Sequence, residues 1–236
     1  MSLPLRNRRI WITRTQPQAE LTAARLERLG WTPVVAPLLQ TRALGGLEHA
    51  LAAGDDADAL AFTSQAAVSA YAAHRPQRSL PVFVVGEGTG RAAYEAGFDS
   101  VNGPEAGQRG DVVGLADRIA AATPRPALVL NPTARKPAAD LADLLARRGV
   151  SARSVAVYET VETETAPPPD DLRGVMVHSP RAGEILAARI AADLAGRLTV
   201  WAISAAAAQA LWTKNFARIL VAAEPNEDAM FARLDD

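Results

Sequence analysis

Side chains that favour anion binding recur at six places in this sequence, each directly after a short apolar run. The segments are rich in hydroxyls, small residues and arginine, and they cover residues 13–16, 63–65, 86–89, 131–135, 178–181 and 204–207. In an open parallel sheet, such segments lie at the carboxyl ends of strands, beside helix N-termini. Backbone N–H groups at helix N-termini favour carboxylate or phosphate groups. The pattern therefore predicts anion-binding loops.

The candidate binding residues are Thr13, Arg14, Thr63, Ser64, Gln65, Gly86, Thr89, Asn131, Arg135, Ser179, Arg181 and Ser204. Taken singly, the serines and Thr63 are better explained as helix N-caps. Surface solubility explains each arginine about as well as anion binding does. Recurrence after six equivalent strands favours binding, although duplicated capping would produce the same pattern. For His178, a core or capping role is favoured over catalysis.

Tyr158 is the candidate catalytic residue. It is one of three tyrosines, and it ends the apolar run 154–157 immediately before Glu159. A phenol both donates and accepts hydrogen bonds, and it can act as a general acid. The alternative is an ordinary tyrosine at the end of a strand, which the residues alone favour.

The candidate residues fall on a repeated strand–helix pattern. Residues 10–12 predict a strand, a helix ends at Gly30, and residues 31–39 predict a second strand. The same order returns later in the chain, because Gly149 lies 119 residues after Gly30. Thr160 likewise lies 119 residues after Thr41. This piece, a strand, a helix and a strand, therefore occurs twice.

A second piece also occurs twice. Strands are predicted at 59–62 and 175–177, and each leads through a small polar loop into a helix. Further strands at 82–85 and 200–204 lead into helices at 90–96 and 205–212. Alternating strands and helices predict two similar α/β domains with parallel sheets flanked by helices.

The pattern leaves the division between the two domains open. Tandem halves would divide near residue 123, whereas pairing the first piece with the last would require the chain to cross twice between domains. Residues 37–42 and 157–163 occupy equivalent places and could form both crossings. Residues 165–171 predict a polar, proline-rich linker.

Composition excludes several classes of function. The 236 residues include 25 basic and 26 acidic ones, so no global field attracts nucleic acid or an anionic membrane. The sequence contains no cysteine, and its three histidines lack metal-ligand spacing. No apolar stretch is long enough for a signal peptide or a membrane span. We therefore expect a cytoplasmic protein with no metal, nucleic acid or membrane partner.

The chain resembles the uroporphyrinogen-III synthase family over nearly its whole length. The resemblance rests on several short motifs in the family's order and spacing. They are Ile12-Thr13-Arg14, Phe62-Thr63-Ser64, Val85-Gly86 with Thr89, the helix 141–149 running into Val157-Tyr158, His178-Ser179-Pro180, and residues 222–225.

The resemblance implies two α/β domains joined by a two-stranded β-ladder, with a hinge and a substrate cleft between the domains. The first domain would be discontinuous, comprising residues 1–37 and 165–236. The second would comprise residues 43–156. Residues 38–42 and 157–164 would be the crossing strands.

The resemblance also implies a reaction. The substrate would be hydroxymethylbilane, which carries eight carboxylates and loses its terminal hydroxyl as water. Ring closure through a spiro intermediate would invert ring D, which makes the enzyme a cyclising hydro-lyase without a cofactor. Tyr158 matches the family tyrosine that is proposed to help the hydroxyl leave. A monomer in transient contact with the preceding bilane-forming enzyme is expected.

Three positions depart from the family pattern. Ala207 stands where the second Gly-x-x-Thr loop has threonine, Asn131-Pro132 replaces Arg-Gly, and His178 precedes Ser179 where Phe-Thr-Ser is usual. These departures keep an alternative open, in which the chain is a non-catalytic module that binds a tetrapyrrole or another anion with the same fold.

Overall fold

The chain forms two units, each built on its own sheet. The computed structural model describes residues 8–164 and 171–236. Unit 1 comprises Met1–Gln40 and Val161–Asp236, and unit 2 comprises Thr41–Thr160. The expected linker at 165–171 lies outside the described residues except for its last residue.

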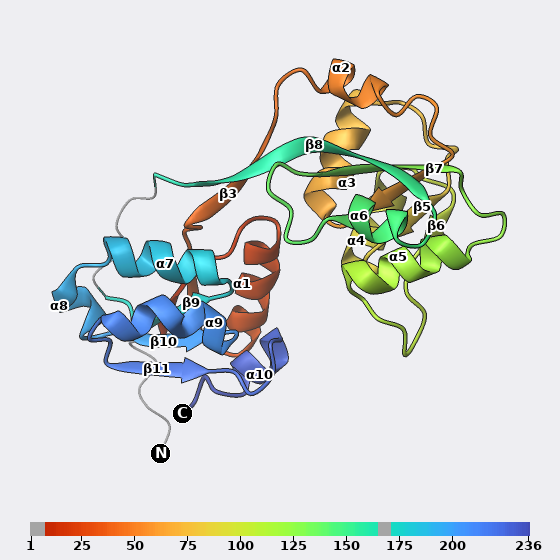
Figure 1. Cartoon of the computed structure of the whole chain (residues 1–236). Coiled ribbons are helices and arrows are strands. Elements are labelled where there is room, and N and C mark those ends of the chain that lie inside the picture. The colour runs from red at the N-terminus through yellow and green to blue at the C-terminus, as the bar shows by residue number, and fades with distance from the viewer. Residues whose placement is uncertain (1–7, 165–170) are drawn as a thin grey trace. The chain divides into compact units, whose positions relative to one another are not determined.

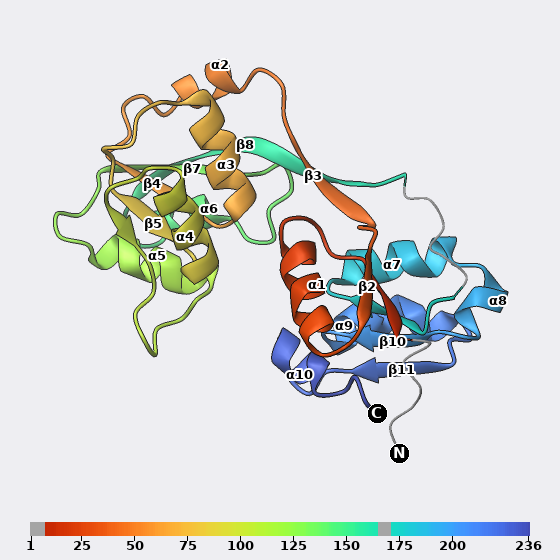
Figure 2. The same cartoon turned by 180° about the vertical axis from the view of Figure 1, so that it is seen from behind.

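Unit 1 is a sheet of five parallel strands with helices on both faces (Figures 1 and 2). Its elements are β1 (Arg9–Ile12), α1 (Gln18–Arg28), β2 (Thr32–Val35), β9 (Gly174–Val177), α7 (Pro180–Arg189), α8 (Ala192–Ala195), β10 (Thr199–Ala202), α9 (Ala205–Ala208), the 3-10 helix η2 (Gln209–Thr213), β11 (Arg218–Val221) and α10 (Glu227–Phe231). The strand order is β11-β10-β9-β1-β2.

The strand order of unit 1 reverses between β1 and β9. The chain moves outward from β1 to β2 on one side, and from β9 through β10 to β11 on the other. Parallel pairing sets Ile10 opposite Gly174 and opposite Pro33. A crevice at the carboxyl ends of the two central strands is the usual ligand position in such a sheet.

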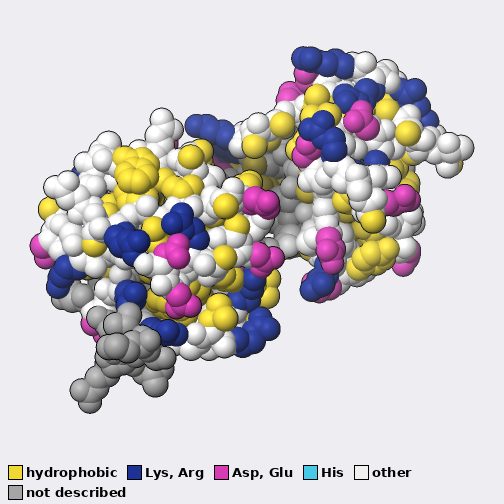
Figure 3. Space-filling view, turned by 90° about the horizontal axis from the view of Figure 1, so that it is seen from below, with side chains coloured by type: hydrophobic (Ala, Val, Ile, Leu, Met, Phe, Trp, Pro, Cys, Tyr) yellow, Lys and Arg dark blue, Asp and Glu magenta, His cyan; other side chains and the backbone are white. Residues whose placement is uncertain are grey.

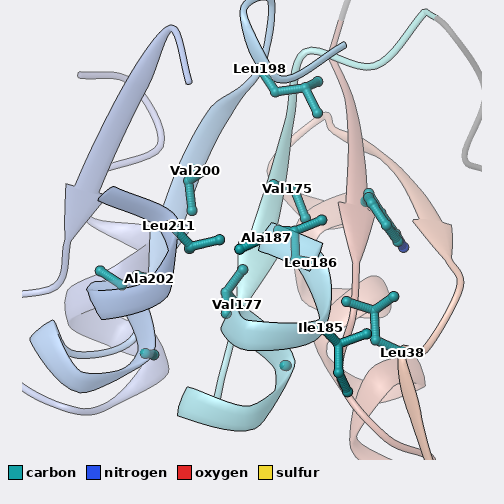
Figure 4. Close-up of a cluster of buried hydrophobic side chains, with 14 of the residues drawn as sticks. Leu38, Val175, Val177, Ile185, Leu186, Ala187, Leu198, Val200, Ala202 and Leu211 are labelled. Carbon is teal, nitrogen blue, oxygen red and sulfur yellow. The ribbon is translucent and has the colours of Figure 1, made fainter. Parts of the chain in front are cut away.

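Alternating side chains of the unit 1 strands fill two apolar layers. In Figure 4, Val175 and Val177 lie next to Leu186 of α7, and Val200 lies next to Leu211. On the other face, Ile10 and Ile12 pack with α1 and α10. Since successive strand residues face opposite sides, apolar runs without alternation are needed to bury both faces.

Unit 2 repeats this architecture with its own strands. Its elements are α2 (Leu47–Ala52), β4 (Ala59–Phe62), α3 (Gln65–His74), β5 (Val82–Val84), α4 (Glu87–Glu95), β6 (Val101–Asn102), α5 (Val112–Ala121), β7 (Leu128–Ala134) and α6 (Leu141–Ala146). Leu60 and Phe62 pack with α2, α3 and α4, whereas Ala59 and Ala61 pack with α5 and α6. The strands β4 to β7 and the adjoining β8 are parallel.

Two strands run through the division between the units. They are β3 (Leu39–Ala43) and β8 (Ser151–Glu162), which are neighbours in the six-stranded order β3-β8-β7-β4-β5-β6. The Leu44 amide donates to Val157, and the Thr163 amide donates to Leu38. Residue numbers rise along one strand as they fall along the other, so this ladder is antiparallel.

The predicted fold class of two similar α/β domains with parallel sheets is confirmed. Two element predictions are wrong in detail. The single strand expected at 31–39 is divided into β2 and β3, with Pro37 in the break. The helix expected at 205–212 is α-helical only to Ala208 and then tightens into η2. Neither change moves a candidate site residue.

Candidate functional site

The candidate residues of unit 1 gather at the carboxyl edge of its sheet, the edge formed by the carboxyl ends of the strands. Thr13 and Arg14 follow β1, and His178 and Ser179 follow β9, its neighbour. The Thr13 hydroxyl donates to the Met176 carbonyl at 2.7 Å, and the residue is 1% exposed. Thr13 therefore ties β1 to β9, and its substrate contact stays a prediction.

A carboxylate of unit 1 occupies the position next to Arg14. Glu227, the first residue of α10, has a side chain that is 16% exposed. It accepts hydrogen bonds from Arg14 at 2.7 Å and from Thr22 at 2.5 Å. Arg25 donates at 3.2 Å, and His178 Nε2 lies 3.1 Å away. We call these five residues the Glu227 cluster. Arg14 is thus half of an internal ion pair.

Burial and hydrogen bonding oppose each other at Glu227. Burial would raise the pKa of this carboxyl, but hydrogen bonds from His178 and Thr22 and the charge of Arg14 lower the pKa from 4.5 to about 2. Burial also lowers the pKa of His178, which keeps the imidazole neutral at pH 7. The neutral ring then carries its hydrogen on Nε2, facing Glu227. The cluster fixes α10 against α1 and the carboxyl edge.

Three candidate serines are helix N-caps. Ser64, Ser179 and Ser204 each accept a hydrogen bond from the amide three residues later, at 3.2 Å in every case. Capping uses the serine oxygen as an acceptor, so the hydroxyl hydrogen is left to donate to an anion. The two roles are compatible, and the binding role stays a prediction. Arg181 follows Ser179 as an exposed residue of α7.

Two candidate loops of unit 2 lie side by side. Gln65 begins α3, and a Cβ atom placed on Gly88 would lie 2.9 Å from the Gln65 Nε2 atom. The loop after β4 and the loop after β5 therefore approach each other closely at Gly88 and Gln65. Gly86 is the N-cap residue of α4, and Thr89 within that helix is 6% exposed. Thr63 precedes Ser64 and is partly buried.

Asn131 replaces a missing backbone donor. β7 pairs with β4 at Leu130 and Leu60. Pro132 has no N–H group for the Ala61 carbonyl, and the Asn131 side-chain amide donates to that carbonyl at 2.9 Å. The Asn131 oxygen accepts from the Ser154 hydroxyl at 3.3 Å. Asn131 is 2% exposed and connects three strands, so its departure from the family pattern has a structural explanation.

A bulge in β8 sets the direction of Tyr158. Thr133 pairs with Ala156, but Ala134 pairs with Tyr158, which leaves Val157 as an extra residue. Neighbouring strand residues normally face opposite sides. Here Val157 is buried in the cluster under α2 and α3, and Tyr158 packs against the same cluster. The bulge therefore re-aims the tyrosine.

The Tyr158 hydroxyl has no protein hydrogen bond within residues 8–164 and 171–236. The Tyr158 carbonyl accepts from the Arg135 amide at 2.8 Å, so the backbone of Arg135 lies beside the tyrosine. A hollow of about 200 Å³, lined in part by Asn131, Thr133 and Ser154, adjoins Arg135. The phenol is thus anchored by the packing of its ring and by its backbone, and its role in catalysis stays a prediction.

Sequence reasoning missed Arg42 and Glu159, which the structure brings to this position. Glu159 follows Tyr158, is 16% exposed, and pairs with Arg42 of β3 and with Arg135. The hydrogen bond from Arg42 and burial oppose each other, and the net effect, with the Arg135 charge, lowers the pKa of Glu159. The charged residue after Tyr158 was visible in the sequence, but its partners lie 117 and 24 residues away.

Basic and acidic side chains are interspersed on the face seen in Figure 3. Among the residues that the structure describes, no helix is long and apolar enough to cross a membrane. The same part of the chain brings no three potential metal ligands together.

Comparisons with known proteins agree on one family. The family model for uroporphyrinogen-III synthase HemD matches residues 20–232. No curated protein matches the chain. The structure is similar to uroporphyrinogen-III synthetase from Helicobacter pylori, with 14% identity, a TM-score of 0.63, and coverage of 95% of this chain and 97% of that one.

A mutant uroporphyrinogen III synthase from Thermus thermophilus is also similar, with 18% identity and a TM-score of 0.51. The alignment covers 96% of this chain and 98% of that one. At these identities the two structures support the fold, and the family model identifies the family. The resemblance inferred from the motifs is confirmed, and the chain belongs to the uroporphyrinogen-III synthase family, whose members are enzymes of heme biosynthesis.

Proposed function

We propose that this chain converts hydroxymethylbilane into uroporphyrinogen III, with loss of water and inversion of ring D through a spiro intermediate. Membership of the family supports the substrate and the product. The observation that carries the proposal is the re-aimed Tyr158, whose ring is packed and whose hydroxyl is free of protein partners within the described residues. No cofactor is needed for this cyclising lyase reaction, and we propose that the enzyme acts in the cytoplasm.

In the first step, the C–O bond of the terminal hydroxymethyl group breaks. Tyr158 would donate a hydrogen bond or a proton to the departing oxygen, which leaves as water. The bilane is left as an electron-poor azafulvene. The substituted carbon of ring D then attacks the former hydroxymethyl carbon of the azafulvene and forms the spiro intermediate. This intermediate fragments and closes again with ring D inverted.

The loops at the carboxyl edges would hold the substrate by its eight carboxylates. N-capping serines, helix-start amides and arginines are suitable donors for carboxylates. Fixing a flexible bilane in a reactive geometry contributes up to about 7–11 kcal/mol in favourable cases. Positioning by many weak donors therefore explains the reaction better than a triad, because directing the closure is the main task.

The isomer of the product tests the proposal. Purified protein, supplied with hydroxymethylbilane by a coupled deaminase, should give the type III isomer by chromatography. Formation of the type I isomer alone, as in the uncatalysed closure, would overturn the proposal.

Tyr158→Phe tests the role of the phenol. The variant should retain its fold, since the ring keeps its packing, and should turn over about 10²–10⁴-fold more slowly if general acid catalysis is lost. Tyr94→Phe is the matched control, because Tyr94 lies on α4 with 60% of its surface exposed. Full activity of Tyr158→Phe would remove the residue from the mechanism.

A binding function without catalysis is the second candidate, and Ala207 favours it. This alanine replaces the threonine expected from the family pattern, and it is fully buried in the apolar layer of α7. Tight binding of a tetrapyrrole without conversion of the bilane would support this alternative.

A further inference from the structure

Two arginines of unit 2 share one partly buried carboxylate. Arg42 donates from Nε to one oxygen of Glu159 at 3.2 Å and from a terminal nitrogen at 2.5 Å. Arg135 donates to the other oxygen at 2.8 Å. The Glu159 side chain is 16% exposed, whereas Arg42 and Arg135 are 65% and 57% exposed. The carboxylate is thus much less exposed than the two guanidinium groups that pair with it.

This arrangement leaves most of the arginine donors unused by Glu159. Each guanidinium has five N–H donors in a fixed plane. Glu159 accepts three of these hydrogen bonds in all. Its single negative charge leaves the group of three with a net charge of +1. A second carboxylate would therefore meet both excess charge and ready donors in a bidentate geometry.

Stabilisation of the fold explains why Glu159 has one arginine partner, but it does not explain why it has two. A partly buried carboxylate such as Glu159 is stabilised by one partner charge, because removing it from water unpaired is costly. One arginine supplies that charge. A second ion pair, whose guanidinium is largely exposed, adds little to the stability of the fold. The second arginine has a clearer purpose if its remaining donors bind a ligand.

The arginine pair adjoins the candidate catalytic residue along the backbone of β8. Glu159 follows Tyr158 directly in β8, and the Arg135 amide donates to the Tyr158 carbonyl at 2.8 Å. All four residues belong to unit 2.

We propose that Arg42 and Arg135 bind a carboxylate of the substrate, and that Glu159, the residue after Tyr158, is the positioning residue that holds them. This inference rests on the proposed function for the identity of its polycarboxylate ligand. It assigns Arg42 and Glu159 to the site and gives Arg135 a specific partner.

Steady-state kinetics of Arg42→Gln and Arg135→Gln test the arginines. Each variant should raise the KM for hydroxymethylbilane about five- to tenfold and keep kcat within about twofold, since one charge-assisted contact is lost. Arg147→Gln is the matched control, because Arg147 is 71% exposed and paired with Asp143 in the same unit. Unchanged KM in both variants, or an equal rise in the control, would overturn the proposal.

The Glu159→Gln variant tests whether Glu159 holds the two arginines in place or only repels the anionic substrate. If Glu159 holds the arginines in place, its loss should raise the KM about threefold, even though it removes a negative charge beside a polyanion site. If Glu159 acts only as a repelling charge, the KM should fall, and that result would overturn the positioning role. Lower stability with unchanged KM would overturn it as well.

Direct binding separates this proposal from the proposed function. Uroporphyrin III, an octacarboxylate, is titrated into wild-type protein and the three arginine variants. Suppose that the wild type forms no type III isomer, and that the Arg42 and Arg135 variants, but not the Arg147 control, bind uroporphyrin more weakly than the wild type. The carboxylate site is then supported and the catalytic proposal fails. If the wild type forms type III and all variants bind uroporphyrin equally, the pair is rejected.

Discussion

The Glu227 cluster allows a quantitative prediction for Glu227→Gln. The carboxylate is 16% exposed and accepts hydrogen bonds from Arg14, Thr22 and Arg25, with His178 Nε2 at 3.1 Å. Its pKa is lowered from 4.5 to about 2. At about 1.4 kcal/mol for each pKa unit, this shift sets an upper limit of about 3.4 kcal/mol on the contribution of the ionised carboxylate to the free energy of unfolding. Solvent screening reduces the expected loss at pH 7 to about 2 kcal/mol.

The stabilisation by Glu227 depends on pH, and the lowered pKa fixes the direction of this dependence. A carboxyl whose pKa is lower in the folded state contributes its full stabilisation above the unfolded pKa. The contribution is lost as the pH falls from about 4.5 toward 2. The difference between wild type and Glu227→Gln should therefore shrink from about 2 kcal/mol at pH 7 to about 1 kcal/mol or less at pH 3.

Urea unfolding followed by tryptophan fluorescence measures this difference in unit 1 alone. All four tryptophans, Trp11, Trp31, Trp201 and Trp212, belong to that unit. A loss of about 2 kcal/mol should lower the midpoint at pH 7 by about 1–2 M urea. Asp228→Asn is the control, because this neighbour is 85% exposed and should change stability by less than about 0.5 kcal/mol. Equal midpoints for wild type and Glu227→Gln at pH 7, or a gap that persists undiminished at pH 3, would refute the reasoning.

Two further substitutions test how the sheets are built. Gly174→Ala should destabilise unit 1 by about 3 kcal/mol in the same fluorescence assay, because a Cβ there would overlap the Thr199 carbonyl and the Trp201 ring. Gly196→Ala, where the new atom would lie 3.6 Å from its nearest neighbour, should be nearly neutral, and similar losses at both sites would contradict this explanation. Asn131→Ala should cost about 2 kcal/mol, measured as faster hydrogen exchange in peptides of β4, because it leaves the buried Ala61 carbonyl unpaired. Exchange no faster than in Ser154→Ala, which removes only a 3.3 Å bond, would count against that role.

The sequence carried enough information for the fold class because its signals are local. Apolar runs such as 59–62 and 175–177 correspond to β4 and β9, since a strand buried on both faces needs no alternation. Glycines at positive φ, Gly30 and Gly149, follow α1 and α6 near the predicted helix ends. The break near Pro37 was missed, because it depends on the chain leaving one sheet for another.

The candidate site was harder to predict from the sequence, because its geometry depends on contacts between residues that are far apart in the chain. Glu227 lies 213 residues from Arg14, and nothing near either residue indicates the pair. The bulge at Val157 exists only in the pairing of β7 with β8, so the direction of Tyr158 could not be read from β8 alone. The strand-end serines were found because their capping signal is local. Their contacts with substrate are a separate property that remains a prediction.

The neighbours of β1 have a consequence for synthesis on the ribosome. Ile10 of β1 lies opposite Gly174 of β9, which is translated 164 residues later. At about 5–20 residues per second, β1 waits roughly 10–30 s for this neighbour. Thr41–Thr160 is continuous and emerges within that interval, so we expect it to fold first. Until then the side of β1 that pairs with β9 remains an open edge to which a second nascent chain could add, and we expect chaperone binding to protect it.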